Sequence, residues 1–404
     1  MPMQEMAASE RRPHIILRII TLSNSKADVV VIGGGVIGTS IAYHLAQKKV
    51  CVTLLEQGDL ASGSSGACDG FVFMQSKKPG VHLQLAMESK RRFERLKDQL
   101  PVSIEYKSKG GMVVIENEAE LEAMHSFVQK QQKIGLDVSL LDVKQARKLE
   151  PNLSSKIKGA TYSPLDGQVN PIALTHGFAL GAKQHGAEIF TNACVRTITV
   201  AGNRVRSVDT DQGQFEADIV VNAAGVYSLE IAKMVNLQIP IKPLRGQILV
   251  TEAIEPILDH CMISARYITA KFKPDSARSE SGGISIEQTS SGNLLLGSTR
   301  EFAGLDNRTT LEGLKKIAAR TSKIIPRLKQ LNIIRSFAGL RPYTSDGLPI
   351  LGPVDDVEGF IMAAGHEGDG IALAPITGEL IAQMIVDGRT DIPLTEFRLG
   401  RFLP

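Results

Sequence analysis

The first strongly patterned segment of the chain is a β-branched run at residues 28–32, which has no charged residue after Asp28. A continuous apolar run of this length is typical of a strand buried on both faces of a parallel sheet. Residues 39–48 then follow a helical pattern, and residues 50–55 form a second apolar run. The order strand, turn, helix, strand predicts the first unit of an α/β fold.

A glycine-rich turn, Gly-Gly-Gly-Val-Ile-Gly, connects the first predicted strand to the predicted helix. Gly33 permits a tight turn, Gly35 lets the backbone approach a pyrophosphate, and Gly38 lets helix and strand pack closely. Glu56 follows the second strand, where a carboxylate accepts hydrogen bonds from ribose hydroxyls. The motif predicts a dinucleotide site, and the acid disfavours the 2′-phosphate of NADP.

The later parts of the chain alternate between this fold and a different one. Residues 218–221 form another buried strand, and the small residues Asn-Ala-Ala-Gly that follow would let backbone approach a dinucleotide. We expect a hairpin at residues 104–116. Residues 243–301, including the whole stretch 261–272, alternate in a way that predicts an antiparallel sheet able to roof a site. A helix expected at residues 310–324 leads back to the first fold.

The block at residues 339–378 combines an arginine beside a proline, a buried strand at residues 360–363, a glycine-rich turn and an apolar helix beginning at Ile371. The first N–H groups of a helix have no partner within it, and the helix dipole places positive charge there. This end of the helix is therefore predicted to face an anion: a phosphate, a carboxylate or the N1/O2 edge of a reduced flavin.

Composition is that of a large enzyme with two domains. The 404 residues are 43% hydrophobic and 22% charged, which allows a substantial core. A net charge of +3 is near balance and predicts no nucleic-acid partner. The four cysteines are scattered without a C-x-x-C motif, so we expect neither an iron–sulfur cluster nor a disulfide framework, and a reducing cytoplasm is the predicted location.

Two segments resemble membrane signals. Residues 29–46 carry no Asp, Glu, Lys or Arg, but their glycines and their change of periodicity predict a strand and helix rather than a membrane span. Residues 1–26 are too short and too charged for a good signal peptide, so we expect a disordered extension. A weak peripheral membrane anchor is the alternative interpretation of this extension.

Several motifs together resemble the D-amino-acid oxidase (DAO) superfamily of FAD enzymes: GGGVIG, ASGSSG, NAAG, GLRPYTSDGLPILGP and GHEGDGIALAPITG, with Glu56. The resemblance covers residues 28–389. Within the superfamily the chain is similar to the glycine and sarcosine oxidase branch. More narrowly, it resembles the flavin-bearing β subunits of heteromeric proline, hydroxyproline and opine dehydrogenases and of hydrogen cyanide synthase.

The resemblance implies a noncovalent FAD and an α/β (α+β) fold, with a Rossmann-type FAD/NAD(P)-binding domain and an inserted, mainly antiparallel β-sheet substrate domain. Residues 27–75, 156–240 and 335–395 would form the FAD-binding domain, and residues 76–155 and 241–334 the substrate domain. The residues implied to hold the cofactor are Gly33, Gly35, Val36, Ile37, Gly38, Glu56, Gln57, Ser62, Ser64, Ser65, Gly66, Val195, Ala224, Gly225, Gly339, Gly368, Asp369, Gly370 and Ile371.

The implied reaction is amine dehydrogenation, in which a hydride moves from the α-carbon to flavin N5 and water hydrolyses the resulting imine. Arg341 is our candidate for the substrate carboxylate, because a guanidinium binds a carboxylate bidentately and the arginine of the matching GLRP motif does so in related oxidases. Its alternative role is a structural ion pair between domains. Tyr267 is a candidate substrate contact or a core residue, and His366 is more typical of a hydrogen-bonded turn than of a general base.

The chain also differs from the sequence patterns of the enzymes that it resembles. Residues 283–288 and 367–370 lack the tyrosine and the arginine of glycine oxidases, which argues against a simple glycine oxidase. No cysteine follows Cys261, which excludes the covalent flavin link of monomeric sarcosine oxidases. Glu367 and Asp369 could attract the cationic end of an opine, but helix capping is the interpretation that we favour.

Two other functions stay open. One is a 2-hydroxy-acid or glycerol-phosphate dehydrogenase on the same fold, and the other is a non-catalytic FAD subunit that organises a complex. The expected partners are an amino-acid or imino-acid substrate and further flavin or iron–sulfur subunits, and no metal ion is expected. Because the chain has no cluster ligands of its own, electron transfer to a quinone would need another chain or direct contact.

Overall fold

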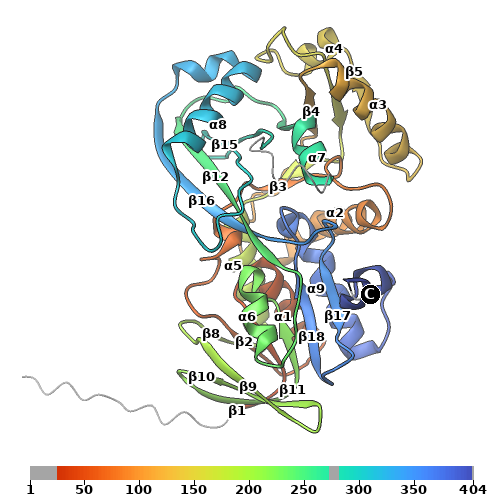
Figure 1. The fold of residues 1–404 in the computed structure, drawn as a ribbon, viewed down its shortest axis with the longest axis vertical. Coiled ribbons are helices and arrows are strands. Elements are labelled where there is room, and N and C mark those ends of the chain that lie inside the picture. The colour runs from red at the N-terminus through yellow and green to blue at the C-terminus, as the bar shows by residue number, and fades with distance from the viewer. Residues whose placement is uncertain (1–24, 273–281, 403–404) are drawn as a thin grey trace, which may run out of the picture.

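The computed structural model describes residues 25–272 and 282–402. Two layered units are stacked along the long axis of the molecule, and the chain passes between them several times (Figure 1). Each unit is built on an eight-stranded sheet, and a separate small sheet pairs β3 (Phe71–Val72) with β7 (Gly167–Gln168). The extension expected at residues 1–26 lies outside the described residues, except for the two residues that begin β1.

The first sheet has a parallel centre in the order β18, β11, β1, β2, β8. Ile32 at the end of β1 lies opposite Asn222 at the end of β11, so both strands end at the same edge. The strands predicted at residues 28–32, 50–55 and 218–221 are confirmed. The strands of this sheet are β1 (Ser25–Ile32), β2 (Val52–Leu55), β8 (Glu188–Phe190), β9 (Val195–Ala201), β10 (Arg204–Thr210), β11 (Gly213–Asn222), β17 (Ile350–Pro353) and β18 (Phe360–Ala364).

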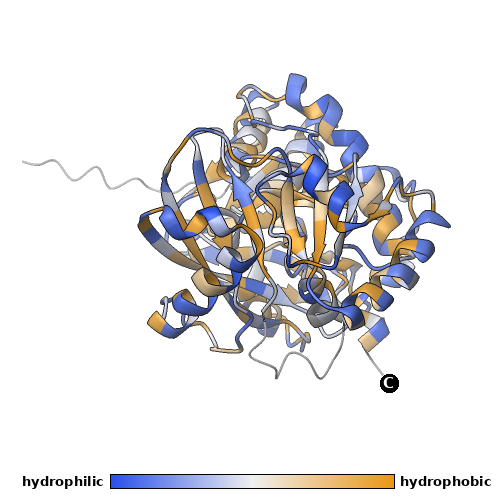
Figure 2. Cartoon of the chain, turned by 90° about the horizontal axis from the view of Figure 1, so that it is seen from above, coloured by the Kyte–Doolittle hydropathy of each residue, from blue (hydrophilic) through white to orange (hydrophobic). Residues whose placement is uncertain are grey.

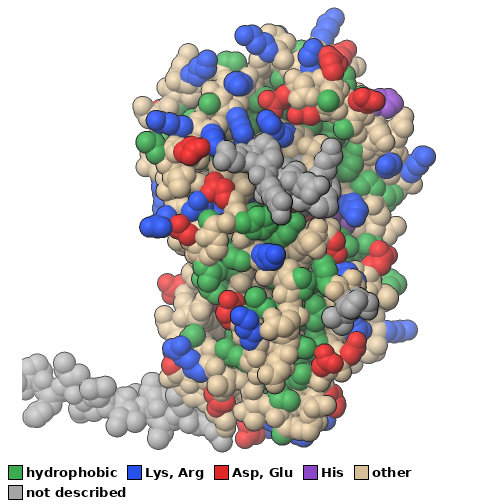
Figure 3. Space-filling model, in the orientation of Figure 1, with side chains coloured by type: hydrophobic (Ala, Val, Ile, Leu, Met, Phe, Trp, Pro, Cys, Tyr) green, Lys and Arg blue, Asp and Glu red, His purple; other side chains and the backbone are tan. Residues whose placement is uncertain are grey.

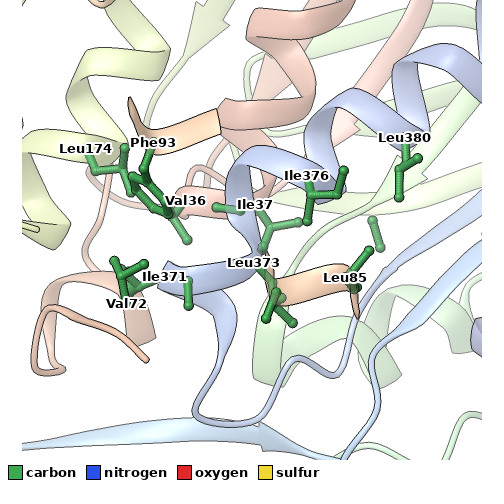
Figure 4. Packing of buried hydrophobic residues seen from close by; sticks show 14 of the residues in the cluster. Val36, Ile37, Val72, Leu85, Phe93, Leu174, Ile371, Leu373, Ile376 and Leu380 are labelled. Atoms are coloured by element: carbon green, nitrogen blue, oxygen red, sulfur yellow. The ribbon is translucent and has the colours of Figure 1, made fainter. Parts of the chain in front are cut away.

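Helices pack against this sheet and share its core. Helix α1 (Val36–Gln47) contacts α5 (Pro171–Gln184) and α9 (Gly370–Asp387), and α2 (Val81–Gln99) contacts α9. Figure 4 shows Ile37 of α1, Leu85 of α2 and Leu373 of α9 converging in this core. The short helix α6 (Ser228–Lys233) follows β11. Figure 2 shows the same division, with hydrophobic strands inside and hydrophilic helix faces outside.

Helix α9 is the one described helix that is long and apolar enough to cross a membrane by length and composition, and 61% of its apolar window is buried. Its close packing on α1 accounts for that composition: the Ser40 hydroxyl donates to the Ala374 carbonyl at 2.8 Å. A Cβ at Gly378 would lie 2.2 Å from the same hydroxyl, so the two helices meet at a glycine. Residues 29–46, the other apolar stretch, form β1 and α1.

The second sheet has the order β16, β12, β15, β14, β13, β4, β6, β5. Its neighbouring strands pair antiparallel except for β13 with β4, so the mainly antiparallel sheet is confirmed. Its strands are β4 (Gly111–Ile115), β5 (Ser139–Leu141), β6 (Gly159–Ser163), β12 (Lys242–Ala253), β13 (Cys261–Ser264), β14 (Ser285–Gln288), β15 (Asn293–Gly297) and β16 (Ile333–Tyr343). Its helices are α3 (Glu118–Gln132), α4 (Val143–Leu149), α7 (Ala265–Phe272) and α8 (Leu311–Ile324).

Two local predictions were wrong. The alternating stretch at residues 261–272 is a strand only to Ser264 and continues as α7, where Ala265 and Ile268, three residues apart, share a buried face. The hairpin expected at residues 104–116 does not form, because β4 pairs with the distant strands β13 and β6 instead. The first error arises because a short apolar pattern does not separate strand from helix, and the second because it does not specify the partner of a strand.

The domain boundaries differ from those expected. Residues 156–240 and 335–395 were assigned to the FAD-binding domain, but β6 and β16 pair in the second sheet. Residues 76–155 were assigned to the substrate domain, but α2 packs on α9 in the core of the first unit. Sheet partners and helix neighbours far apart in sequence decide these boundaries, and no local pattern encodes them.

Candidate active site

A cavity of about 310 Å³ lies between the two units. Its walls come from the ends of β1, β2, β11 and β18, from the serine–glycine loop at residues 61–70, and from β12, β16 and α7 of the second unit. On the face shown in Figure 3, hydrophobic side chains gather at mid-height, where the two units meet. The cavity therefore joins the predicted dinucleotide edge to the predicted roof.

Most of the residues singled out in the sequence line this cavity, although they come from distant segments. Those lining it are Gly33, Gly35, Val36, Ile37, Glu56, Gln57, Ser62, Ser64, Ser65, Val195, Ala224, Gly225, Tyr267, Gly339, Arg341, His366, Gly368, Gly370 and Ile371. Gly38, Gly66 and Asp369 do not line it.

The glycine-rich turn is held against the end of β11. Gly33 has φ +116°, and a Cβ there would lie 2.5 Å from the Ala223 carbonyl oxygen. A Cβ at Gly38 would lie 1.9 Å from the Gly33 carbonyl oxygen, so Gly38 serves the packing of α1 on the turn rather than the cavity wall. Together these contacts place the N-terminal end of α1 at the cavity, where a helix favours negative charge.

Glu56 is anchored by backbone donors on both oxygens. Its Oε2 accepts from the Gly34 N–H at 2.6 Å, and its Oε1 accepts from the Gly58 N–H at 2.8 Å. Each carboxylate oxygen has a second lone pair available for another donor. The carboxylate is thus oriented at the cavity wall before any ligand binds.

The serine–glycine loop is packed onto both units rather than loosely connecting them. The Val36 N–H at the start of α1 donates to Ser65 Oγ at 3.0 Å, and the Ser64 hydroxyl donates to the Leu340 carbonyl of β16. A Cβ at Gly339 would lie 2.2 Å from the Ala67 carbonyl oxygen, and one at Gly66 would lie 2.3 Å from the Ala61 carbonyl oxygen. These glycines therefore let the loop fold tightly against the cavity.

Arg341 lies on β16 at the other end of the cavity. Its guanidinium donates to Ser298 Oγ at 2.9 Å and to the Thr299 carbonyl at 3.2 Å. Gly246 on β12 faces it, and a Cβ there would lie 2.3 Å from the guanidinium. Among the described residues Arg341 forms no salt bridge, so its charge lies half-buried at the cavity with neutral hydrogen-bond partners.

His366 lines the cavity, but its ring is committed elsewhere. It is buried, and Nε2 lies 3.1 Å from Thr377 Oγ1. Burial lowers the pKa of His366 to about 3, although the nearby Asp369 charge opposes the shift. The ring is therefore neutral at physiological pH, which supports a hydrogen-bonded turn residue rather than a general base.

The acidic residues of the turn before α9 are paired, which corrects the capping interpretation of Asp369. Asp369 occupies the N-cap position without a side-chain cap hydrogen bond. Its carboxylate instead lies 2.9 Å from Lys77 Nζ and 3.1 Å from His82 Nε2, in a buried cluster. Asp369 itself does not line the cavity, although its neighbours Gly368 and Gly370 do.

Glu367 also has a cationic partner. Its Oε1 lies 2.5 Å from Arg300 Nη1, both side chains are buried, and Oε2 accepts from the Gly368 N–H at 2.7 Å. The Arg300 guanidinium lies 6.0 Å from the centroid of the Tyr267 ring. Glu367 and Arg300 thus neutralise each other and brace the turn and Tyr267 at the cavity.

Comparison with known proteins identifies the family of the chain. A family model described as FAD dependent oxidoreductase, DAO, matches residues 28–384, so the chain belongs to the DAO family of FAD-dependent oxidoreductases. The expected superfamily, fold class and cofactor are confirmed. No group of three or more His, Cys, Asp or Glu able to hold a metal ion occurs among the described residues.

Individual relatives cover nearly the whole chain. The chain is 31% identical over 417 residues to the hydrogen cyanide synthase subunit HcnC of Pseudomonas protegens, covering 93% of this chain and 96% of that protein. It is 30% identical to the glycine oxidase of Geobacillus kaustophilus, covering 93% and 97%. The solved structure of L-proline dehydrogenase from P. horikoshii has a TM-score of 0.86 and 27% identity, covering 94% and 98%.

The residues at the dinucleotide end fit the ADP half of FAD, because Gly35 lacks a side chain that would fill the wall and Glu56 is held ready as an acceptor. We predict that Glu56→Gln weakens FAD binding about 10- to 100-fold, since a hydrogen bond to a charged group contributes about 1.5–3 kcal/mol. Titration of the apoprotein with FAD, followed by flavin fluorescence, measures this. Glu188→Gln, exposed on the adjacent strand β8, is the control and should bind like the wild type.

Proposed function

We propose that the protein dehydrogenates the C–N bond of a small amino acid, imino acid or N-substituted amino acid of the glycine, sarcosine, proline, hydroxyproline or opine type. The observation that carries this proposal is Arg341, a half-buried cation at the cavity that forms no salt bridge among the described residues. A guanidinium in this state favours a carboxylate, which it binds through two parallel hydrogen bonds.

The residues of the chain supply position and charge. FAD, when bound, supplies the two-electron acceptor for this chemistry. Arg341 would hold the substrate carboxylate and thereby orient the α-carbon, and Tyr267 would limit the cavity on the side of α7. The N-terminal end of α9, where Gly370 and Ile371 line the wall, would contribute the positive end of a helix dipole.

Two alternatives use the same site. A 2-hydroxy acid also has a carboxylate for Arg341, and glycerol phosphate offers a phosphate to the same guanidinium. A non-catalytic FAD subunit would need the dinucleotide end of the cavity alone. We favour an amine substrate because the named relatives include a glycine oxidase and a proline dehydrogenase.

The proposal also covers the partner chains, the location of the protein and the attachment of the flavin. The relative from Pseudomonas protegens is named as a subunit, so we propose a hetero-oligomer in which other chains carry electrons from the flavin. We propose a cytoplasmic location, with peripheral membrane contact as the alternative. A noncovalent flavin is proposed because no cysteine follows Cys261 in the sequence.

Anaerobic mixing with a substrate panel tests the function. We expect amino acids, imino acids or opines to bleach the flavin absorbance near 450 nm within seconds, while 2-hydroxy acids and glycerol phosphate leave it unchanged. Purification from the native source should also copurify partner chains. Bleaching by hydroxy acids alone would support the first alternative, and a flavin that no small molecule reduces would support the second.

A further inference from the structure

Asp69 lies on the wall of the same cavity as Arg341. It lies near the end of the serine–glycine loop, two residues before β3, and is half-buried. Its carboxylate interacts electrostatically with the Arg341 guanidinium, yet Asp69 and Arg341 form no salt bridge within 4.0 Å. A carboxylate, Asp69, and a guanidinium, Arg341, thus line one cavity without forming a salt bridge with each other.

A second carboxylate, Glu287 on β14, lies behind Asp69. It is 3% exposed and does not line the cavity, and its Oε2 accepts from the Gly70 N–H at 2.7 Å. Because Gly70 follows Asp69 directly, the Glu287 carboxylate is hydrogen-bonded to the backbone next to Asp69. Burial, followed by the charge of Asp69, raises the pKa of Glu287 to about 8.

The balance of charge around this pair favours uptake of a proton. Burial also raises the pKa of Asp69, although Arg341 and Ser285 oppose the shift. Burial raises the pKa of both nearby thiols, which therefore stay protonated. The other charged or titratable groups that interact with the pair are Cys68, Lys77, Glu105, Lys109, Cys261 and Arg341.

We propose that Asp69 binds the substrate nitrogen and accepts its proton, so that Arg341 and Asp69 together recognise the two charges of a zwitterion. In this step an N–H bond of the ammonium breaks and an O–H bond forms on the Asp69 carboxylate. The products are a neutral amine and a neutral carboxylic acid, and no electrons are transferred. The inference rests on the proposed function and identifies the group that selects an amine.

Such an acceptor has a clear chemical purpose. Dehydrogenation of a C–N bond needs the nitrogen lone pair, but an aliphatic amine with a pKa near 10 is neutral in only on the order of one molecule in a thousand at pH 7. Without an acceptor in the site, only this neutral fraction can react. A carboxylate with a raised pKa beside the nitrogen allows the abundant ammonium form to bind and then lose its proton.

The test is the pH dependence of kcat/KM for the best amine of the panel in wild type and Asp69→Asn. We expect a shallow profile for the wild type between pH 7 and 10. The asparagine variant should lose about tenfold for each pH unit below the amine pKa, with a loss of about 1,000-fold at pH 7 that shrinks to a few-fold at pH 10. Asp69→Glu, which retains an acid, should restore the shallow profile.

Asp59→Asn is the matched control, since Asp59 is exposed just before the same loop and should leave the profile unchanged. A loss for Asp69→Asn that is equal at every pH, or no loss, would overturn the inference. If no amine reduces the wild-type flavin, the proposed function itself fails. If amines do reduce it, the pH profile tests the role of Asp69 separately from the proposed function.

A binding measurement covers the case in which turnover of the variants is too slow to analyse. The flavin absorbance is titrated with acetate, which has no nitrogen, and with trimethylglycine, which has a permanent cation and cannot be dehydrogenated at nitrogen. We expect Asp69→Asn to bind acetate several-fold more tightly and trimethylglycine at least tenfold more weakly than the wild type. Equal affinities for both probes in the two proteins would overturn the inference.

Discussion

Replacing Arg341 with methionine is expected to lower kcat/KM for an amino-acid substrate by on the order of 10²- to 10³-fold. The guanidinium lies half-buried at the cavity, and its hydrogen-bond partners Ser298 and Thr299 are neutral, so its charge is available for a carboxylate. Loss of one partner of a desolvated, hydrogen-bonded charge pair costs about 2–5 kcal/mol. Arg341→Lys should lie between the two proteins, because an ammonium lacks the planar fork.

The measurement is steady-state kinetics with parallel determination of bound FAD. Arg335→Met is the matched control, because Arg335 is exposed on the same strand β16 and should leave kcat/KM within about twofold. An amine analogue without a carboxylate should be turned over equally slowly by wild type and Arg341→Met. If Arg341→Met retained full activity with full FAD content, Arg341 would have a structural role and the carboxylate would bind elsewhere.

The parts of this fold that are contiguous in sequence could be predicted from it. β1, the glycine-rich turn, α1 and β2 follow one another directly, and each carries its own signal: a β-branched run, obligatory glycines and helical periodicity. The N-cap Asn170 and the proline after it mark the start of α5 for the same reason. For the second sheet, only its mainly antiparallel type could be predicted. Its strand order could not, because the pairing of β13 with β4 joins segments about 150 residues apart.

Some residues of the candidate site could likewise be predicted from the sequence, and others could not. Glycines and small residues at strand ends are visible in the sequence because backbone geometry demands them, as at Gly33 with its positive φ. The roles of charged residues are not visible in the sequence, since they depend on which distant residues lie beside them in the fold. Asp69 could have been found, because it lies only three residues after the serine–glycine motif at residues 61–66. Lys77 and Glu287 carried no local signal, and only their burial beside distant carboxylates or backbone N–H groups makes them notable.

Asp369→Asn is expected to destabilise the protein by about 3–5 kcal/mol, the largest stability effect that we predict. Lys77 is 2% exposed, and removal of the Asp369 charge leaves its ammonium buried without the carboxylate 2.9 Å away. Two further acceptors of Lys77 Nζ, the Phe73 carbonyl at 2.6 Å and Ser76 Oγ at 2.8 Å, are neutral. A neutral acceptor stabilises a buried ammonium less than a carboxylate does. Because Asp369 precedes α9 directly, this loss should also affect Gly370 and Ile371, which line the cavity.

Urea unfolding of the apoprotein and of the FAD-saturated protein measures the effect, since ligand binding adds a separate contribution. Asp387→Asn is the control at the other end of α9: its ion pair with Lys48 spans 2.8 Å but is more than one-third exposed, so we expect a change within about 0.5 kcal/mol. Combining Lys77→Met with Asp369→Leu should recover much of the stability, because the uncompensated charge is removed together with its partner. A single Asp369→Asn variant as stable as Asp387→Asn would mean that the buried Lys77 charge is compensated by another group, and the ion pair would then not be what holds the start of α9 in place.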